Sequence, residues 1–435
     1  MKRNVKLTIL STVIMLAVQV FAVGPAQAEQ VSVDAKMIER LENMLNAQQQ
    51  QINTLQQEIK QLKQSTVEAQ TQAREAKAVA DEVKTARLDP VEKAVTSGED
   101  KVKLAISGQI NRALNIADDG DKTDAYFVDS DASNTKVRFV GTALIDEDLT
   151  LGSKLELAFA PNESGEVSQS NDGDSGDFTD QRYAEITLTS KRYGMLYLGK
   201  GDTSSNGTAE VDLSGTDLIQ YASTADIVGG LFFRQSSNDV LTDITVSGAF
   251  KDYDGLSRKN RLRYDTPNFY GFGLSGSVIS DRRWDTAVRW GGDGYGVKAA
   301  AAAAVAYLHK DDGDYQYDGS FSILHEATGL NVTFSTGTKD ADNQDDDPYN
   351  IWGKLGWLTS LNGFGNTAFG IDYGHSENIA ADDYEGDTFG VAVVQNFDAY
   401  ATQVYFQFRN FSLDTNDDAN VSDINVGTVG ARVKF

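Results

Sequence analysis

The stretch TVGARVKF, residues 428–435, decides the fold class. Its side chains alternate in character, with Val429, Ala431, Val433 and Phe435 on one face and Thr428, Gly430, Arg432 and Lys434 on the other. A soluble half-buried strand shows the same alternation, but here the pattern recurs from about residue 101 onward. In an outer-membrane barrel the apolar face meets lipid and the polar face lines a lumen. The pattern therefore predicts a transmembrane β-barrel.

Composition agrees with that prediction. The chain has 435 residues, of which 39 are Gly, 5 are Pro and none is Cys, and its mean hydropathy is −0.37. Such a value excludes a helical membrane protein and suits strands that are only half apolar. Without Cys, neither a disulfide nor a lipid anchor on Cys is available.

The first residues have the features of an export signal. Lys2, Arg3 and Lys6 precede an apolar run from Leu7 to Val23, and an A-x-A site follows at Ala26 to Ala28. We expect residues 1–28 to be a cleaved signal peptide rather than a membrane helix, because a polar helical segment follows.

A heptad pattern begins at Ile38, and we expect residues 29–88 to form an α-helical coiled coil in the periplasm. Its large seam residues are Ile38, Leu41, Leu45, Gln48, Ile52, Leu55, Ile59 and Leu62. A solitary helix is the alternative, but it would leave this apolar seam in water. Asp89 and Pro90 end the helix, and residues 89–100 read as a linker.

After residue 101, short turns alternate with long acidic connections, as expected of periplasmic turns and extracellular loops. The short turns are predicted at 145–148, 190–194, 266–271, 327–329 and 396–399. Trp284 and Trp290 share a face with Val288 and stand about 20 Å apart along a strand, so both can reach the interfacial aromatic girdles.

Two further stretches carry a family resemblance. QRYAEITLTSKRYGMLYLGKGD (181–202) and RLRYDTPNFYGFGLSGS (261–277) resemble strand–turn–strand segments on either side of the inward loop in the trimeric general porins of Gram-negative outer membranes. The final Phe435 matches the residue by which such barrels are recognised for assembly. The predicted coiled coil is similar to an extension found in the DcaP-like subgroup, which are trimers of sixteen-stranded barrels.

The resemblance covers residues 101–435 and implies an all-β membrane protein with a sixteen-stranded antiparallel barrel. The alternative is a barrel of eighteen strands, in which residues 231–235 and 240–250 form a hairpin in the wall. We choose sixteen, because the resemblance places the strand at 261 directly after an inward loop. The run Ala299–Ala304 favours helix by propensity, but we expect a strand there.

Other motifs indicate neither a cofactor nor a metal site. Gly271, Gly273 and Gly276 have dinucleotide-binding spacing, yet a strand follows them instead of a helix. His325 and Glu326 begin a zinc-protease motif whose second His is absent, and the acidic residues at 340–347 lack the Gly and Glu of a calcium loop. We expect no catalysis and no nucleic-acid partner.

The charge pattern suggests a pore. Residues 101–435 hold 27 Lys and Arg against 51 Asp and Glu, a net charge of −24, and most acidic residues fall in predicted outer loops. Strand positions opposite the apolar face include Arg409 and several further arginines. The candidate constriction residues are Arg138, Arg182, Lys200, Glu210, Asp212, Asp217, Arg261, Arg263, Arg283 and Arg289, of which Arg182 and Lys200 match basic wall positions of the family.

From these observations we expect a homotrimeric outer-membrane porin with a periplasmic N-terminal extension. It would be a passive, water-filled channel for small hydrophilic solutes, with anionic solutes favoured by the basic wall. Outer-membrane lipid and lipopolysaccharide would surround it, and the coiled coil could contact peptidoglycan or a periplasmic partner. The alternative is a structural tether or adhesin whose barrel anchors a helix that contacts the cell wall.

Overall fold

The computed structural model describes residues 102–159, 161–172, 179–309, 315–341, 344–415 and 420–435. The chain divides into two compact units, Met1–Glu92 and Lys93–Phe435, and all described residues belong to the second. The predicted signal peptide, coiled coil and linker lie outside the described residues.

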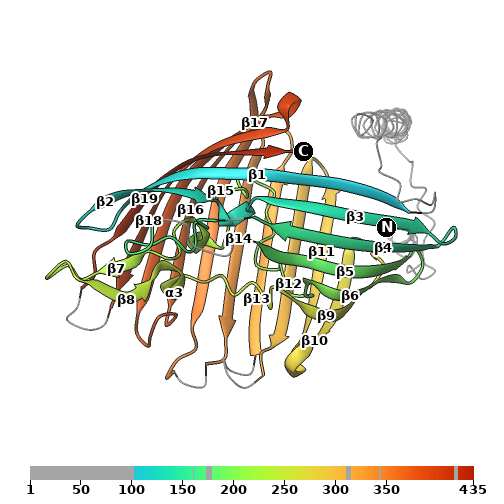
Figure 1. Ribbon diagram of the computed structural model, residues 1–435, viewed down its shortest axis with the longest axis horizontal. Helices are drawn as coiled ribbons and strands as arrows, with labels where there is room; N and C mark the ends of the chain where they lie inside the picture. The colour runs from blue at the N-terminus through green and yellow to red at the C-terminus, as the bar shows by residue number, and fades with distance from the viewer. Residues whose placement is uncertain (1–101, 160, 173–178, 310–314, 342–343, 416–419) are drawn as a thin grey trace, which may run out of the picture. The chain divides into compact units, whose positions relative to one another are not determined.

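Sixteen antiparallel strands form a closed barrel, as predicted (Figure 1). The barrel closes because β1 pairs with β19, from Gln109 opposite Lys434 to Asp118 opposite Asn425. Its wall strands are β1 (Lys103–Asp118), β3 (Lys136–Leu144), β4 (Leu149–Ala158), β5 (Asp180–Ser190), β6 (Gly194–Asp202), β9 (Arg258–Asp265), β10 (Phe272–Ile279), β11 (Trp284–Gly294), β12 (Val297–Tyr307), β13 (Tyr315–His325), β14 (Leu330–Lys339), β15 (Tyr349–Asn362), β16 (Gly365–Glu377), β17 (Glu385–Phe397), β18 (Thr402–Asp414) and β19 (Ile424–Lys434).

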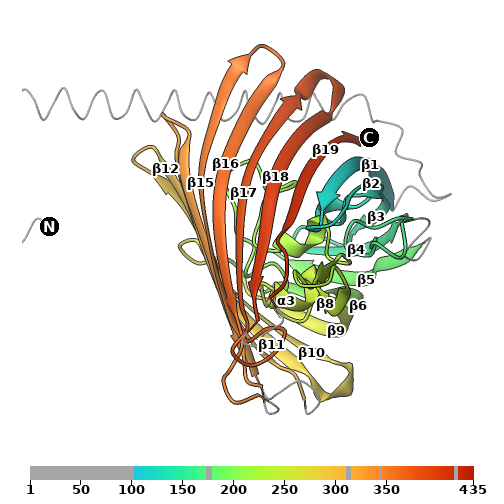
Figure 2. The same ribbon diagram turned by 90° about the vertical axis from the view of Figure 1, so that its left-hand side faces the viewer.

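An extra strand, β2 (Thr123–Asp129), shares one edge of β1 with β3. β2 pairs with the extracellular half of β1 and β3 with the other half, so the pair acts as one interrupted wall strand. The wall is also uneven in height. β15 to β18 have 13 or 14 residues each, whereas β3 to β6 have 9 to 11, and Figure 2 shows the long strands on one side of the barrel.

All five predicted short turns join neighbouring strands at one end of the barrel. Two further short turns were missed, at Tyr295–Gly296 and at 363–364. Gly329 shows why glycine is used in such a turn: it has φ +71°, and an added Cβ would lie 1.7 Å from the carbonyl oxygen of Leu358. Any side chain there would clash with the backbone of the adjoining strand.

The outward face carries the aromatic girdles that the sequence predicted. Trp284 stacks on Tyr307 near the extracellular end, with ring centroids 6.1 Å apart, and Trp290 lies beside Phe272 near the opposite end. The alanine run forms β12 because pairing with β11 and β13 along its whole length outweighs helix propensity. Its inward Ala306 is fully buried against Leu256 of the inward loop.

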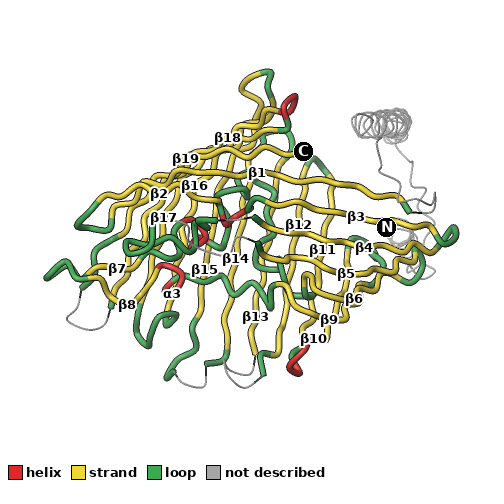
Figure 3. Tube along the Cα trace, in the orientation of Figure 1, coloured by secondary structure: helices red, strands yellow, loops and turns green. Residues whose placement is uncertain are grey.

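Helices are short throughout the described residues (Figure 3). They are α3 (Val246–Ala249), η2 (Asp131–Ser133), η3 (Thr224–Ile227), η4 (Ser280–Arg282) and η5 (Asp398–Tyr400). In the part of the chain that the structure describes, no helix has the length and apolar character needed to cross a membrane.

The segment between β6 and β9, residues 203–257, is the inward loop. β7 (Phe232–Arg234) and β8 (Leu241–Thr245) lie within it and pair only with each other as a separate sheet, which confirms sixteen wall strands rather than eighteen. The loop crosses the inside of the barrel from β10 to β16. Successive hydrogen bonds join it to Ser277 (2.7 Å), Ser320 (2.9 Å), Ser322 (3.0 Å), Ser335 (2.7 Å) and Asp372 (2.5 Å).

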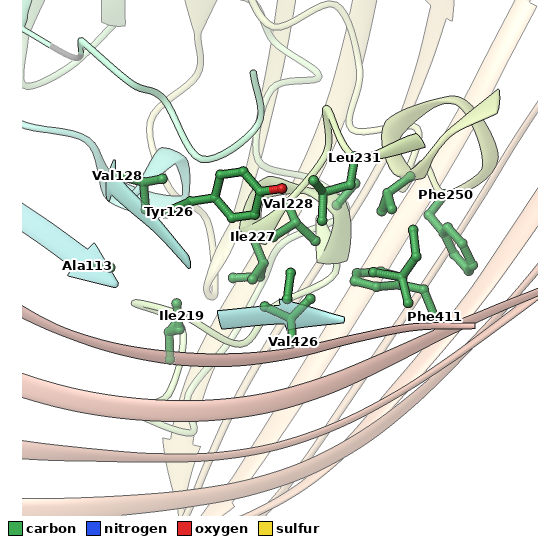
Figure 4. Close-up of a cluster of buried hydrophobic side chains, with 14 of the residues drawn as sticks. Ala113, Tyr126, Val128, Ile219, Ile227, Val228, Leu231, Phe250, Phe411 and Val426 are labelled. Atoms are coloured by element: carbon green, nitrogen blue, oxygen red, sulfur yellow. The ribbon is translucent and has the colours of Figure 1, made fainter. Parts of the chain in front are cut away.

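Part of the lumen is filled by an apolar cluster rather than by water. Ile219, Ile227 and Val228 of the inward loop pack among inward side chains of the wall, including Phe411 and Val426 (Figure 4). Phe250 meets Phe411 edge to face, with centroids 5.1 Å apart. The loop is therefore docked on the β16–β19 side, by burial of the same kind that stabilises a soluble core.

Buried ion pairs reinforce this docking. Lys354 on β15 donates to Asp212 of the loop at 2.5 Å, and both side chains are at most 3% exposed. Asp372 accepts two hydrogen bonds of 2.8 Å from Arg409 and one of 3.0 Å from Trp352. The Gln220 amide of the loop also donates to Asp372. These contacts fix the loop to β15, β16 and β18, and β3–β5 and β9 form the opposite side of the barrel.

Candidate pore constriction

A polar cavity of about 360 Å³ lies between the inward loop and that opposite wall. Its charged side chains fall into two groups. Arg182 and Arg258 come from wall strands β5 and β9, and Asp131 from the helix η2. The inward loop supplies Glu210, Asp226, Asp252 and Asp254.

The wall side has an excess of positive charge. Arg138 Nε lies 2.5 Å from one carboxylate oxygen of Glu156, and Arg182 Nε lies 3.2 Å from the other. Two guanidinium groups thus share one carboxylate. The register between β4 and β5 shifts between Glu156 and Leu157, leaving Arg182 as the extra residue of a bulge. The bulge lets both Tyr183 and Arg182 reach the lumen side.

Further cations extend this basic wall. Lys154 lies 3.1 Å from the centroid of the Tyr183 ring, and Arg258 lies 5.7 Å from it. The Tyr183 hydroxyl in turn donates to Asp202 at 2.6 Å. The cation–π contact does not cancel the charge of Lys154, whereas Arg258 is also paired with Asp202 at 3.3 Å. Lys136 on β3 pairs across the sheet with Ala158 and adds another cation to this wall.

Hydrogen bonds fix the acidic side chains of the loop. Asp254 accepts from the backbone amides of Gly207 (2.7 Å) and Ala209 (2.9 Å). The Tyr221 hydroxyl donates to Asp226. The Ser223 hydroxyl contacts both Glu210, at 3.1 Å, and Asp252. Since a hydroxyl carries one proton, both contacts are full hydrogen bonds only when one carboxyl is itself protonated.

Burial and mutual repulsion keep these carboxyl groups partly protonated at neutral pH. Burial raises the pKa of Asp226 to about 8, the pKa of Asp254 to about 7 and the pKa of Asp131 to about 6. Burial also raises the pKa of Glu210 well above its usual range, with Asp254 as the strongest charged neighbour. Near pH 7 the arginines of the cavity are charged, whereas Asp226 and Glu210 are largely protonated and Asp254 is about half ionised, so the acidic side carries less negative charge than its five carboxyl groups suggest.

The structure brings Arg138, Arg182 and Glu210 together at this site. Asp212 instead pairs with Lys354, and Asp217 is exposed on the loop outside the lining of this cavity. Lys200 lies on the same face of β6 as the exposed Leu196 and Leu198, which is the outward face. Its amine is 3.4 Å from Asp180.

Three further candidate arginines, Arg261, Arg263 and Arg289, bind the base of the inward loop. Arg261 binds Glu185 at 2.6 Å and the carbonyls of Gly199 and Asp202. Arg263 binds Asp265 and the Thr203 carbonyl. Arg289 donates to the Asn206 carbonyl at 2.8 Å, and Arg283 lines a second cavity nearer the outside.

Sequence reasoning missed several residues of the site. They are Asp131, Lys136, Lys154, Asp226, Asp252, Asp254 and Arg258. Lys136 and Lys154 alternate with apolar residues on their strands, a signal that was available. The loop carboxylates could not be found, because irregular backbone has no fixed side-chain period. No group of three or more His, Asp or Glu in the described residues has the geometry to hold a metal ion.

Solved structures share the barrel fold of this chain. The chain resembles an anion-selective porin from Comamonas acidovorans, with a TM-score of 0.55 and 15% identity over 77% of this chain and 100% of the other. The trimer form of OmpT, an outer membrane protein of Vibrio cholerae, has a TM-score of 0.50 and 14% sequence identity, over 77% of this chain and 100% of the other. The outer membrane channel DcaP of Acinetobacter baumannii has a TM-score of 0.49 and 11% sequence identity, over 78% of this chain and 99% of the other.

A search of curated protein sequences found no match. The family model for Gram-negative porins, however, matches residues 77–429, which is most of the chain. The matched region contains nearly all of the barrel, the inward loop and both charged sides of the constriction. The chain belongs to the family of Gram-negative porins.

Proposed function

We propose that the water-filled pore of this outer-membrane diffusion channel favours small anionic solutes. The observation that carries the proposal is the pair of arginines, Arg138 and Arg182, that share the single carboxylate of Glu156 beside the constriction. Opposite them stand carboxyl groups whose ionisation is suppressed by burial. Charge at the narrowest point counts most, because outer-loop charges more than about 8 Å from the solute path are screened at physiological salt.

The experiment is reconstitution into a planar bilayer under a salt gradient. The proposal predicts open channels whose reversal potential has the sign of an anion-selective pore. A folded barrel that inserts but conducts no current would favour the tether or adhesin instead. No catalysis forms part of the proposal.

We further propose that the protein is a homotrimer, joined through the wall of β1 and β3–β6. In the described part of β1 and β3–β6 the exposed large hydrophobic residues are aliphatic: Ile106, Ile110, Ile116, Leu144, Leu151, Leu155, Ile186, Leu188, Leu196 and Leu198. Phe127 on the adjoining β2 is the aromatic exception. β9–β18 expose aromatic rings, including Tyr264, Phe272, Trp284, Trp357 and Phe406. Since aromatic girdles mark lipid-facing wall, the aliphatic side is the better surface for a neighbouring subunit.

The selectivity should depend on pH. Below about pH 5, Asp131, Asp226 and Asp254 are largely protonated, so the constriction is most positive and anion preference is greatest. Raising the pH through 6 to 8 ionises them while the arginines stay charged, and anion preference should fall. Reversal potentials at pH 5, 7 and 9 test this. Asp226→Asn should remove the part of the change near pH 8. A preference that rises with pH would contradict the assignment.

The N-terminal segment is proposed to stabilise the trimer through its coiled coil. Leu55→Asp with Ile59→Asp would place charges in the seam and should loosen the subunits. Single-channel conductance should stay nearly unchanged, because the pore residues all lie in the barrel. Native electrophoresis of the trimer together with conductance measures both effects. An isolated 29–88 peptide that stays monomeric and unfolded at high concentration would speak against this role.

A further inference from the structure

A second cavity, of about 550 Å³, lies beside the constriction on its extracellular side. We call it the outer vestibule. Its wall residues sit at the extracellular ends of neighbouring strands, with Lys259 on β9, Leu308 just after β12 and Lys339 at the end of β14. Ser223, Asp226, Asp252, Asp254 and Ser257 line both this cavity and the constriction. A solute leaving the vestibule inward therefore meets the constriction next.

The charges of the vestibule are divided between its two sides. The wall contributes only cations, Lys259, Arg283 and Lys339. Within the described residues, Lys259 and Lys339 have no ion-pair partner inside 4.0 Å. Arg283 pairs only with Asp281, at 3.5 Å, and that carboxylate is 80% exposed. An exposed pair of this kind contributes little, so all three cations can bind a ligand.

The loop side of the vestibule carries the carboxyl groups. Asp252, Asp254 and Asp226 line it, together with Lys251. The contact of Asp252 with Ser223 and the two backbone hydrogen bonds to Asp254 hold these groups in place. The Gln316 amide fixes the same loop segment by donating to the Tyr253 carbonyl at 2.6 Å. Three wall cations therefore face, across one cavity, carboxyl groups held in fixed positions, which carry partial negative charge near pH 7 and ionise further when a cation approaches.

Apolar side chains lie between these two poles, the wall cations and the loop carboxyl groups. Phe250, Leu256 and Leu308 line the vestibule along with the charged groups. Leu256 packs against Ile279, Ala306 and Leu308, so this apolar part is attached to the barrel wall. The cavity volume is within the usual range for small-molecule sites, which combine apolar lining with a few placed polar groups.

We propose that the outer vestibule binds zwitterionic organic solutes, with an acidic group at Lys259, Arg283 and Lys339, an ammonium group at Asp226, Asp252 and Asp254, and an apolar linker between them. A dianion would place its second charge against the carboxyl groups, and a dication would place one against the three wall cations. An ammonium also favours the ionised form of the carboxyl groups it approaches. The inference rests on the protein forming an open channel, but not on its preference between chloride and potassium.

Current block in planar bilayers tests the site with three probes of equal length. They are 6-aminohexanoate, which is zwitterionic, hexanedioate and 1,6-diaminohexane. We expect 6-aminohexanoate, added on the extracellular side, to reduce the single-channel current at a concentration at least about tenfold lower than either other probe, a difference of about 1.4 kcal/mol. A shorter series, glycine and 4-aminobutanoate, then reports the distance between the poles.

Variants separate the two poles. Lys339→Gln should weaken block by 6-aminohexanoate and hexanedioate but not by the diamine, whereas Asp252→Asn should weaken block by 6-aminohexanoate and the diamine but not by hexanedioate. Lys298→Gln, whose lysine pairs with Glu326 at the other end of the barrel, is the matched control and should change none of them. Equal block by all three probes, or stronger block by hexanedioate, would overturn the site. The salt-gradient reversal potential, measured without probe, tests the proposed anion preference separately.

Discussion

Replacing Lys354 with methionine should release the inward loop from the wall and give a channel with higher, noisier conductance. The substitution leaves the Asp212 carboxylate buried without its partner, which typically costs about 3–5 kcal/mol. It also removes the hydrogen bonds from Lys354 to Thr216 (2.9 Å) and to the Gln220 carbonyl (2.7 Å). Single-channel recording and urea unfolding in lipid vesicles measure the two effects.

The double variant Lys354→Met with Asp212→Asn is the control. It removes both charges together, and an Asn side chain can still accept the 2.8 Å hydrogen bond from the Ser214 amide. Because no unpaired charge remains, the double variant should recover most of the lost stability, and its current noise should fall toward that of the native channel. If the single variant conducts like the native protein, the loop is not held by this ion pair.

Reversing the basic wall should invert the selectivity of the pore. Arg182→Glu with Arg258→Glu changes the charge beside the constriction by four units. Two unit charges 4 Å apart interact with an energy of about 1 kcal/mol in bulk water and about 4 kcal/mol near a protein surface. The anion-to-cation permeability ratio should therefore fall at least about tenfold, to a cation-selective value, in a salt-gradient measurement.

Two further variants serve as controls for the charge reversal. Arg182→Gln with Arg258→Gln avoids placing new carboxylates beside Glu156 and should shift the ratio in the same direction by less. Lys200→Gln changes a cation on the outward face, and the reversal potential should not move. If Lys200→Gln shifts selectivity as much as the arginine variants, the placement of the constriction is wrong.

The strand pattern predicted the wall well, because alternation of apolar and polar residues specifies a face independently of any contact. Arg138, Arg261, Arg263, Arg289 and Arg409 were expected on the face opposite the apolar one. The register pairs each of them with inward neighbours, such as Glu156 opposite Arg138. The pattern gave no information about which side chains these arginines contact. Arg261 meets Glu185, which lies 76 residues away in the sequence, and such distant pairing has no local signal.

Where the period is broken, the sequence could not place the site. A one-residue bulge brings Arg182 to the lumen side, whereas strict alternation puts Lys200 outside, although both matched basic wall positions of the family. A shift of one residue reverses the face of a side chain. The apolar filling of the lumen was missed for a related reason. Val426 and Phe411 face inward like polar lumen residues, and their apolar partners come from a loop without a period.

Thiol modification tests whether the pore is an off-centre passage with a basic wall. The chain has no Cys, so Arg138→Cys and Val426→Cys each introduce a single thiol, one beside the constriction and one in the apolar cluster. A negatively charged methanethiosulfonate reagent reacts only where water reaches the thiol. We expect the reagent to reduce the current through Arg138→Cys channels and to leave Val426→Cys channels unchanged. Equal modification of both, or reaction at Val426→Cys alone, would contradict this placement of the passage.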